Sequence, residues 1–166
     1  MEKKINDFLT ILKTENDKKE ALFLLDDLLE NLFKTDGSLS VFIKKSSQSP
    51  VAKSVISLLP DGWENPQDKD DLEKMIIKIK NTVQNLKTVN ITVAVNPNET
   101  MLQSLNDWAS KNFESKIIFD VTVNPEIIGG AIIVSGGTYH DFSLIKRLKD
   151  VMEAGKNEII ASLKTN

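Results

Sequence analysis

Cysteine is absent from the 166-residue sequence, and histidine occurs only once. The lack of cysteine excludes disulfides, thiolate zinc sites and cysteine nucleophiles, and one histidine cannot supply a histidine-based metal site. No stretch approaches the roughly 18 consecutive apolar residues of a membrane span. The opening residues MEKKINDFLTILK also lack the unbroken apolar core of a signal peptide. We therefore expect a folded soluble protein that reaches a membrane only through a partner.

A basic face for nucleic acid is missing as well. The formal net charge is -3, and acidic and basic residues are spread over both halves of the chain. Nucleic-acid binding needs lysine and arginine gathered on one surface. The charge pattern therefore excludes nucleic acid as an expected partner.

Apolar residues recur at helical spacing through residues 1–87, which predicts an N-terminal domain that is a bundle of helices. The polar run KTENDKKE is expected to separate the first two helices, and Asp36-Gly37 to end the second. Pro60, Gly62 and Pro66 exclude a continuous rod after that. The expected helices cover about residues 5–12, 22–33, 41–43, 55–59 and 70–86.

In residues 88–166 apolar residues alternate with polar ones in several segments, the two-residue repeat of β-strands, which predicts a second domain built on strands. Strands are expected over about 88–95, 116–123 and 131–135, with a helix from Asn98 after the first and a long last helix from about Asp141. The order β-α-β-β-α predicts a small sheet with helices packed on one face. The expected fold class is α+β, an all-α bundle over 1–87 followed by a β-α-β-β-α domain over 88–166.

The stretch NPEIIGGAIIVSGGTYHDFS, residues 124–143, holds four of the seven glycines and the single histidine and tyrosine. It contains neither GxxxxGK[ST] nor a GxGxxG leading from a strand into a helix, so a phosphate-binding loop is not expected. The pairs Gly129-Gly130 and Gly136-Gly137 are instead expected to supply positive φ at a bend and at a strand end.

His140 and Asp141 are the candidates for acid–base chemistry in this stretch. Adjacent residues of an extended segment point to opposite sides, so the two are not expected to form a dyad. Asp141 is expected to cap the last helix, with Ser143 as the alternative, and His140 is expected to be a turn residue. The sequence thus predicts no catalytic, cofactor-binding or metal-binding residues.

The second expected helix has more apolar residues than one face needs. Its candidate partner-binding residues are Leu22, Phe23, Leu25 and Leu29. Either this helix is central in the bundle, or it leaves a groove for another amphipathic helix, because both use the same anchors.

The stretch 124–143 and its flanks resemble the C-terminal domain of the delta subunit of F-type ATP synthases, called OSCP in mitochondria. That family has an Asp-Pro-x-Leu/Ile-Ile-Gly-Gly turn between strands, then an Asp-x-Ser that opens a long helix with a basic residue and leucine. The resemblance covers about residues 88–163, with Asn124 in place of the usual Asp. The family's opening motif with Tyr-Ala and Ala-Leu is absent. The N-terminal domain of the family has six helices, whereas the first half of this sequence has room for about five. The matching residues are Asn124, Pro125, Ile128, Gly129, Gly130, Asp141, Ser143, Arg147 and Leu148.

This resemblance implies a non-catalytic stator subunit without cofactors. Its helical domain would bind the N-terminal helices of the alpha subunits, and its C-terminal domain the C-terminal helices of the b subunits. The expected location is the cytoplasmic face of a bacterial plasma membrane, held there by partners, with a mature organellar chain as the other possibility. The alternatives are an E-like stalk subunit of V/A-type ATPases, a small α+β enzyme, and a free-standing adaptor that binds helices. Pro50, Pro60 and Pro66 argue against the long first helix of the E subunit.

Overall fold

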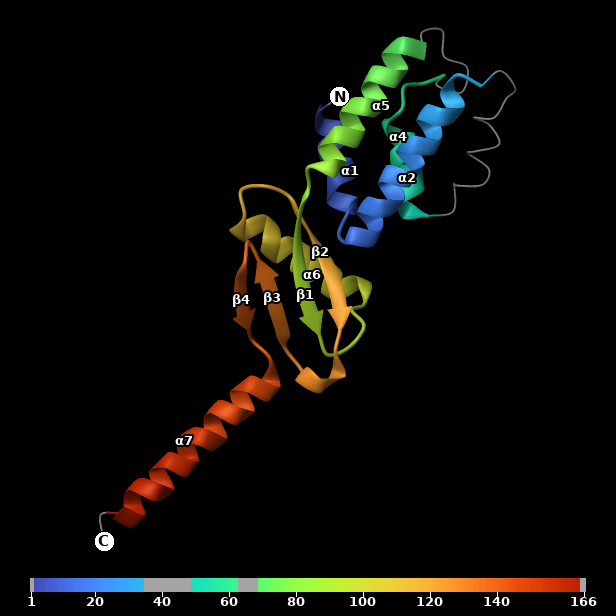
Figure 1. Cartoon of the computed structure of the whole chain (residues 1–166). Helices are drawn as coiled ribbons and strands as arrows, with labels where there is room; N and C mark the ends of the chain where they lie inside the picture. Colours follow the sequence, from blue (N-terminus) through green and yellow to red (C-terminus); the bar gives the residue numbers. More distant parts are fainter. Residues whose placement is uncertain (1, 35–48, 63–68, 165–166) are drawn as a thin grey trace. The chain divides into compact units, whose positions relative to one another are not determined.

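The computed structural model describes residues 2–34, 49–62 and 69–164, with side chains described as far as residue 156. The chain forms two compact units. One consists of Met1–Lys87 with Asn106–Ile118, and the other of Thr88–Leu105 with Phe119–Asn166. The first unit is mainly helical and the second is built around a sheet (Figure 1).

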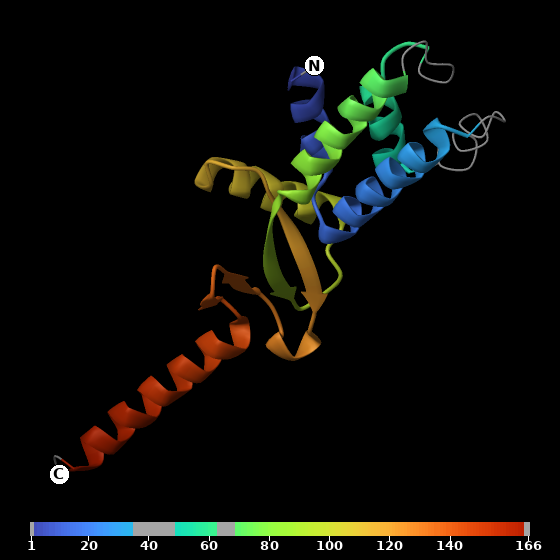
Figure 2. The same ribbon diagram turned by 45° about the horizontal axis from the view of Figure 1, so that its top comes forward.

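Four helices make up most of the first unit: α1 (Glu2–Ile11), α2 (Glu15–Leu32), α4 (Pro50–Leu58) and α5 (Lys69–Gln84). Helix α2 packs against both α4 and α5, and α1 packs against α4. Figure 2 shows α2 and α5 side by side from a second direction. The helices predicted near 5–12, 22–33, 55–59 and 70–86 are confirmed. The short helix expected at 41–43, and the end of the second helix expected at Asp36-Gly37, lie outside the described residues.

Helix α2 begins inside the polar run that was predicted to separate two helices. Thr14 is its N-cap: the Thr14 hydroxyl accepts from Asp17 N at 3.2 Å, and the Asp17 carboxylate accepts from Thr14 N at 2.8 Å. This reciprocal capping box satisfies two backbone donors that the first turn of a helix leaves open. The run is therefore the first turns of α2, and the break is confined to the residues just before it.

The core of the first unit is formed by apolar side chains from all four helices. Leu12, Leu25 and Val83 have no exposed surface, and the buried Ile118 from the later stretch belongs to the same cluster. Lys18 Nζ on α2 donates to Leu86 O at 3.1 Å, which satisfies a carbonyl at the end of this core. The whole cluster comprises Ile5, Phe8, Leu12, Ala21, Leu24, Leu25, Leu28, Leu32, Val51, Ala52, Val55, Leu58, Leu59, Leu72, Ile76, Ile79, Val83, Leu86 and Ile118.

A mixed sheet with strand order β2-β1-β3-β4 organises the second unit. Figure 1 shows β2 running in the same direction as β1, while β3 is antiparallel to both β1 and β4. In register, Ile91 lies opposite Ile133, and Ile133 lies opposite His140. The elements after α5 are β1 (Lys87–Val93), α6 (Glu99–Asn112), β2 (Ile117–Val123), the 3-10 turn η1 (Pro125–Ile127), β3 (Ala131–Ser135), β4 (Thr138–Asp141) and α7 (Leu144–Lys164). The end of α6 and the start of β2 fall within Asn106–Ile118 and so belong to the first unit.

Two predictions for this unit are wrong. The strand β4 was not expected, because its four residues TYHD lack apolar alternation; it forms by pairing with β3 across the Gly136-Gly137 turn. The last helix was expected to pack on the sheet, yet α7 contacts η1, and its apolar residues from Leu144 to Met152 are largely exposed. The fold class itself, α+β with a helical first part, is confirmed.

In the described parts of the chain, no helix has both the length and the apolar character needed to cross a membrane.

Leu25 and Phe23 on α2 allow the core to be tested with two nearby substitutions. Leu25 is fully buried, whereas Phe23 is 69% exposed. We expect Leu25→Ala to lower the free energy of unfolding by about 2–5 kcal/mol, because it leaves a cavity. Phe23→Ala should change it by less than about 0.5 kcal/mol. Urea unfolding of both variants measures this, and a similar loss in both would contradict the assigned core.

Candidate functional site

The residues of the glycine-containing stretch form one hydrogen-bonded corner between β2, β3 and α7. Asn124 N donates to Val93 O at 2.8 Å, and the Asn124 side chain accepts from Glu126 N at 3.0 Å, so Asn124 caps the η1 turn. Pro125 is the first residue of that turn, where its missing N–H costs nothing. The corner is closed by Leu144 N, which donates to Gly129 O at 2.8 Å. These hydrogen bonds therefore join the start of α7 to the turn that follows β2.

Backbone conformation in this corner differs from the prediction at one of the two glycines. Gly130 has φ +76, and a Cβ there would lie 2.2 Å from Phe142 O, so this position requires glycine. Gly129 does not have a positive φ; the preceding residue, Ile128, has φ 66 and ψ -39 instead. A β-branched residue in this conformation is an outlier. The bend predicted from the glycine pair is present, but its first positive φ is at Ile128 and not at Gly129.

The start of α7 is capped by Ser143 rather than by Asp141. Ser143 Oγ accepts from Lys146 N at 3.3 Å, and Ser143 O accepts from Arg147 N at 3.3 Å. Asp141 is the last residue of β4, and its carboxylate accepts from Ser143 N at 2.9 Å. Asp141 therefore positions the capping residue, and the alternative weighed in the sequence is the one that the structure adopts.

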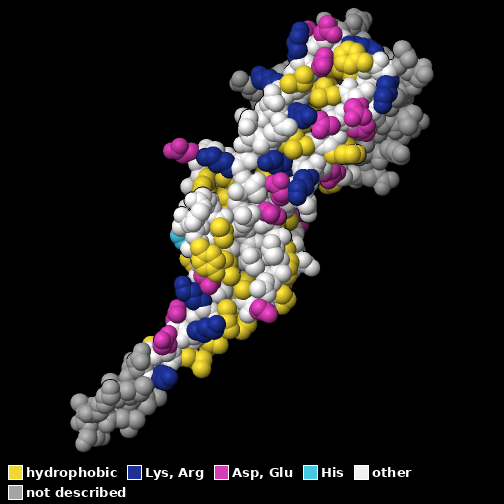
Figure 3. Space-filling model, in the orientation of Figure 1, with side chains coloured by type: hydrophobic (Ala, Val, Ile, Leu, Met, Phe, Trp, Pro, Cys, Tyr) yellow, Lys and Arg dark blue, Asp and Glu magenta, His cyan; other side chains and the backbone are white. Residues whose placement is uncertain are grey.

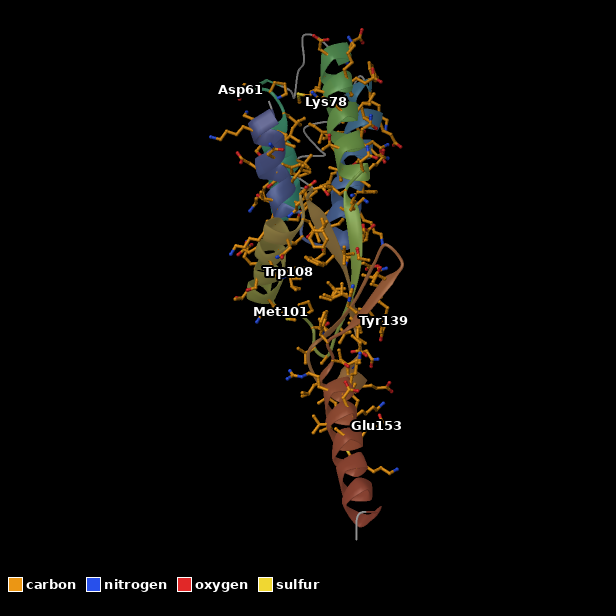
Figure 4. All side chains as sticks on the ribbon, turned by 90° about the vertical axis from the view of Figure 1, so that its left-hand side faces the viewer. Asp61, Lys78, Met101, Trp108, Tyr139 and Glu153 are labelled. Atoms are coloured by element: carbon orange, nitrogen blue, oxygen red, sulfur yellow. The ribbon has the colours of Figure 1, made fainter. Side chains whose placement is uncertain are left out.

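His140 lies in β4 and is not a turn residue. Its ring stacks on Phe142, with ring centroids 6.1 Å apart and an interplanar angle of 9°. Successive strand residues point to opposite faces, so Tyr139 and Asp141 lie on the face away from His140. Tyr139, labelled on the hairpin in Figure 4, donates from Oη to Asp141 Oδ2 at 3.4 Å. Among the described residues, no group of three His, Asp or Glu side chains could hold a metal ion. This hairpin therefore presents aromatic surface and no assembled acid–base pair.

The carboxyl of Asp141 is the titratable group most affected by the corner. Hydrogen bonds from Ser143 are the main cause that lowers the pKa of Asp141, with the nearby Lys146 charge adding to them. Desolvation, and after it the neighbouring Asp141 charge, raise the pKa of Tyr139. Tyr139 is exposed and Asp141 is half-buried, so these shifts reflect hydrogen bonds and local charge and do not indicate a buried reactive site.

Lys116, in the first unit, also has a perturbed pKa. Burial lowers the pKa of this ammonium, and the Lys13 charge lowers it further, against Asp107 and Asp17, which raise it. Its Nζ donates to Oδ1 of Asn106, one of the two buried polar residues among those described. A perturbed lysine can mark a functional site, but here it satisfies a buried amide, which is a structural role.

The candidate partner-binding residues on α2 do not form one surface. Leu25 is buried in the core, and Leu22 and Leu29 are half-buried against it. Phe23 is the exposed member of the set. At the end of the same helix, Phe33 is 52% exposed and lies under Lys69 Nζ, which is 6.0 Å from the ring centroid. Helix α2 is therefore central in the bundle, with Phe23 and Phe33 as its exposed aromatic residues.

Sequence reasoning missed an exposed apolar face on α7. The side chains of Leu144, Leu148, Val151 and Met152 are between 49% and 70% exposed. Figure 3 shows hydrophobic side chains along one side of the first half of this helix. Helical spacing indicated the stripe, but it was assigned to the core because most such stripes pack inside their own chain. Ile159, Ile160 and Leu163 of the same stripe lie outside the described side chains.

Comparison with known proteins gives a match that spans nearly the whole chain. The family model described as "ATP synthase delta (OSCP) subunit" matches residues 2–154. The ATP synthase subunit delta of Francisella tularensis subsp. novicida (strain U112) is 30% identical over 90 residues, which cover 52% of this chain and 49% of that protein. The same subunit of Francisella tularensis subsp. mediasiatica (strain FSC147) is 29% identical over 90 residues. The chain thus spans about half the length of the curated relatives it matches.

A solved structure also shows a partial likeness. One chain of the cryo-EM structure of the Polytomella F-ATP synthase, in primary rotary state 3, matches with a TM-score of 0.41 and 14% sequence identity. The match covers 46% of this chain and 99% of that chain. This likeness is too low for any conclusion about shared geometry.

The two glycines of the corner should respond differently to the same substitution. Gly130→Ala should cost about 1–3 kcal/mol, because alanine is strained at positive φ and its methyl group would overlap Phe142 O. At Gly129 a Cβ would make ordinary contacts of 3.7 Å with Leu144, so Gly129→Ala should change stability little. Thermal unfolding measures both; equal melting temperatures for the two variants would contradict the corner described above.

The lowered pKa of Asp141 gives a pH-dependent contribution to stability. A carboxyl whose pKa is lower in the folded state stabilises the fold above its unfolded-state pKa, and this contribution is lost as the pH falls through the folded-state pKa. We therefore expect Asp141→Ala to lower the melting temperature at pH 7 and to have a smaller effect below pH 3.8. Asp150→Ala, at an exposed position of α7, is the control. A difference that stays constant from pH 7 to pH 3 would refute the stabilising hydrogen bond from Ser143 N to the Asp141 carboxylate.

Proposed function

The chain belongs to the ATP synthase delta (OSCP) subunit family, and from this membership we propose that it is a peripheral-stalk subunit of a proton-translocating F-type ATP synthase. In this role it links the catalytic head to the membrane-anchored b subunits, so that rotation of the central stalk drives synthesis and does not turn the head. The observation that carries the proposal is the family match over residues 2–154, which includes both the helical part and the sheet.

The hydrogen-bonded corner supports the same proposal from the residues. The Asn124-Pro125 turn, Gly130 and the Asp141–Ser143 cap are each required by local geometry, and together they join β2, β3 and α7. These are the positions at which the sequence resembles the family. A stator domain must carry force without changing shape, and a corner with several coupled backbone constraints suits that demand.

The two ends of the chain are proposed to bind different partners. The helical domain, residues 1–87, would bind N-terminal helices of the alpha subunits, with the exposed Phe23 of α2 as a contact. The C-terminal domain, residues 88–166, would bind C-terminal helices of the b subunits, with the exposed face of α7 as the docking surface. This division of the chain and these contacts are part of the proposal.

The proposed role needs no chemistry of its own. A clamp holds partners by surface complementarity, so the chain would act as a structural subunit without a catalytic site, cofactor or small-molecule substrate. Its place would be the cytoplasmic face of the bacterial plasma membrane or the organellar equivalent, held there by its partners.

A pull-down tests the proposal. Tagged full-length chain is incubated with detergent-treated membranes of the source organism, and bound proteins are identified by mass spectrometry. We expect ATP synthase alpha and b subunits to be recovered together, because the chain is proposed to join them. Recovery of another helical protein in their place would favour the adaptor alternative and overturn the stator function.

A matched control separates the two proposed surfaces. Phe23→Asp should reduce recovery of alpha while leaving recovery of b unchanged, because Phe23 belongs to the helical domain. Loss of both subunits in this variant would mean that Phe23 does not act at one surface alone.

A further inference from the structure

The turn after α4 contains the one described aspartate that lies outside every helix and strand. Helix α4 ends at Leu58, and Leu59 is the last residue of this segment in the hydrophobic core. Asp61 and Gly62 follow as an exposed turn, and Figure 4 labels Asp61 there. Because this turn adds nothing to the core, its chemistry is determined by its own backbone and by solvent.

The backbone nitrogen that follows an aspartate can attack the aspartate's own carboxyl group. A regular helix or strand opposes this attack, because it fixes the backbone torsions and holds interior N–H groups in hydrogen bonds. Within the described parts of the chain, no group accepts a hydrogen bond from Gly62 N, and none donates one to the Asp61 carboxylate. Both reacting groups are therefore free of partners in this turn.

Glycine is the following residue that hinders the attack least. Gly62 has φ +78, and a Cβ built there would meet nothing within 4 Å, so the turn is open on this side. Without a side chain at Gly62, the Asp61 carboxyl carbon can approach the Gly62 nitrogen closely. By contrast, Asp107 and Asp150 lie in α6 and α7 and are followed by Trp108 and Val151.

We propose that Asp61–Gly62 is a site of spontaneous covalent modification, at which the folded chain converts Asp61 into isoaspartate. The observations that carry this proposal are the exposure of the turn, the absence of a side chain on the attacking residue and the lack of hydrogen bonds to the reacting groups. The proposal is independent of the peripheral-stalk function, because it needs no partner.

The reaction proceeds in two steps and needs water alone. Gly62 N forms a bond to Asp61 Cγ, a C–O bond of the carboxyl breaks, and that oxygen leaves as water with the amide proton and the carboxyl proton. The product is a cyclic succinimide. Water then opens the ring: cleavage at Cγ restores aspartate, and cleavage at the backbone carbonyl carbon leaves Gly62 attached through Cγ, which is isoaspartate.

The modified chain keeps its mass and its number of carboxylates. Its main chain is longer by one methylene group between α4 and α5, and the original backbone carboxyl becomes the side group. Leu59 and Leu72, the core residues on either side of the turn, are not part of the reacting dipeptide. We therefore expect the helices to stay packed, so that isoaspartate accumulates in folded chain with time.

Peptide mapping of aged protein tests the proposal. Full-length chain is kept folded in neutral buffer for several weeks and digested with trypsin, which releases Asp61 in the peptide 54–69 and the second Asp-Gly pair in the separate peptide 35–44. We expect a new species of peptide 54–69 with unchanged mass and a different retention time. Electron-transfer fragmentation, and methylation by an isoaspartyl carboxyl methyltransferase with S-adenosylmethionine, identify it as isoaspartate. A peptide that stays a single species would overturn the proposal.

Two controls test the part played by the turn. Asp61→Glu should abolish the new species, because glutamate would have to close a larger ring, and the peptide 150–156 should show no change at Asp150 within α7. In urea-unfolded chain, Asp61 should isomerise about as fast as in folded chain, because the folded turn already leaves Gly62 N accessible. A much slower reaction in the folded chain would show that the fold protects this turn and would overturn the assignment.

Discussion

The close approach of Gly130 to the backbone of Phe142 determines how the second unit is put together. There is no space there for a Cβ, and hydrogen bonds on either side join Phe142 N to Ala131 O and Leu144 N to Gly129 O. Because of this contact, β4 pairs with β3 in a single register and α7 starts at a fixed point. The positive φ of Ile128 lies two residues before this contact, and the exposed stripe of α7 begins two residues after Phe142.

The two units use apolar residues in different ways. In the first unit, helical stripes meet each other and bury residues such as Leu25 and Val83 completely. In the second unit, the residues of α7 have the same spacing but remain exposed. On the proposed function this contrast is useful, because one part of a stator has to be rigid by itself and another has to offer a surface that a partner completes.

The sequence predicted most elements of the fold because helices and strands leave distinct periods in the chain. Leu72, Ile76, Ile79 and Val83 mark α5, and the alternation of Val89, Ile91 and Val93 marks β1. Periodicity shows that a face is apolar but not what covers it, which is why α7 was wrongly placed on the sheet. Likewise, a glycine pair marks a bend without showing which residue takes the positive φ, and TYHD has no apolar pattern from which β4 could be recognised. For the candidate site, the turn and cap residues were predicted from their chemistry, whereas the choice between Asp141 and Ser143 depended on where β4 ends.

The composition of the first unit has a consequence for how the chain is made. Its residues come from two separate stretches, Met1–Lys87 and Asn106–Ile118, and the fully buried Ile118 belongs to its core. A ribosome that has released only the first 87 residues has therefore delivered the helices without all of the side chains that they enclose. The helical unit reaches its final packing after the first strand and α6 have been synthesised, so its maturation is coupled to that of the sheet.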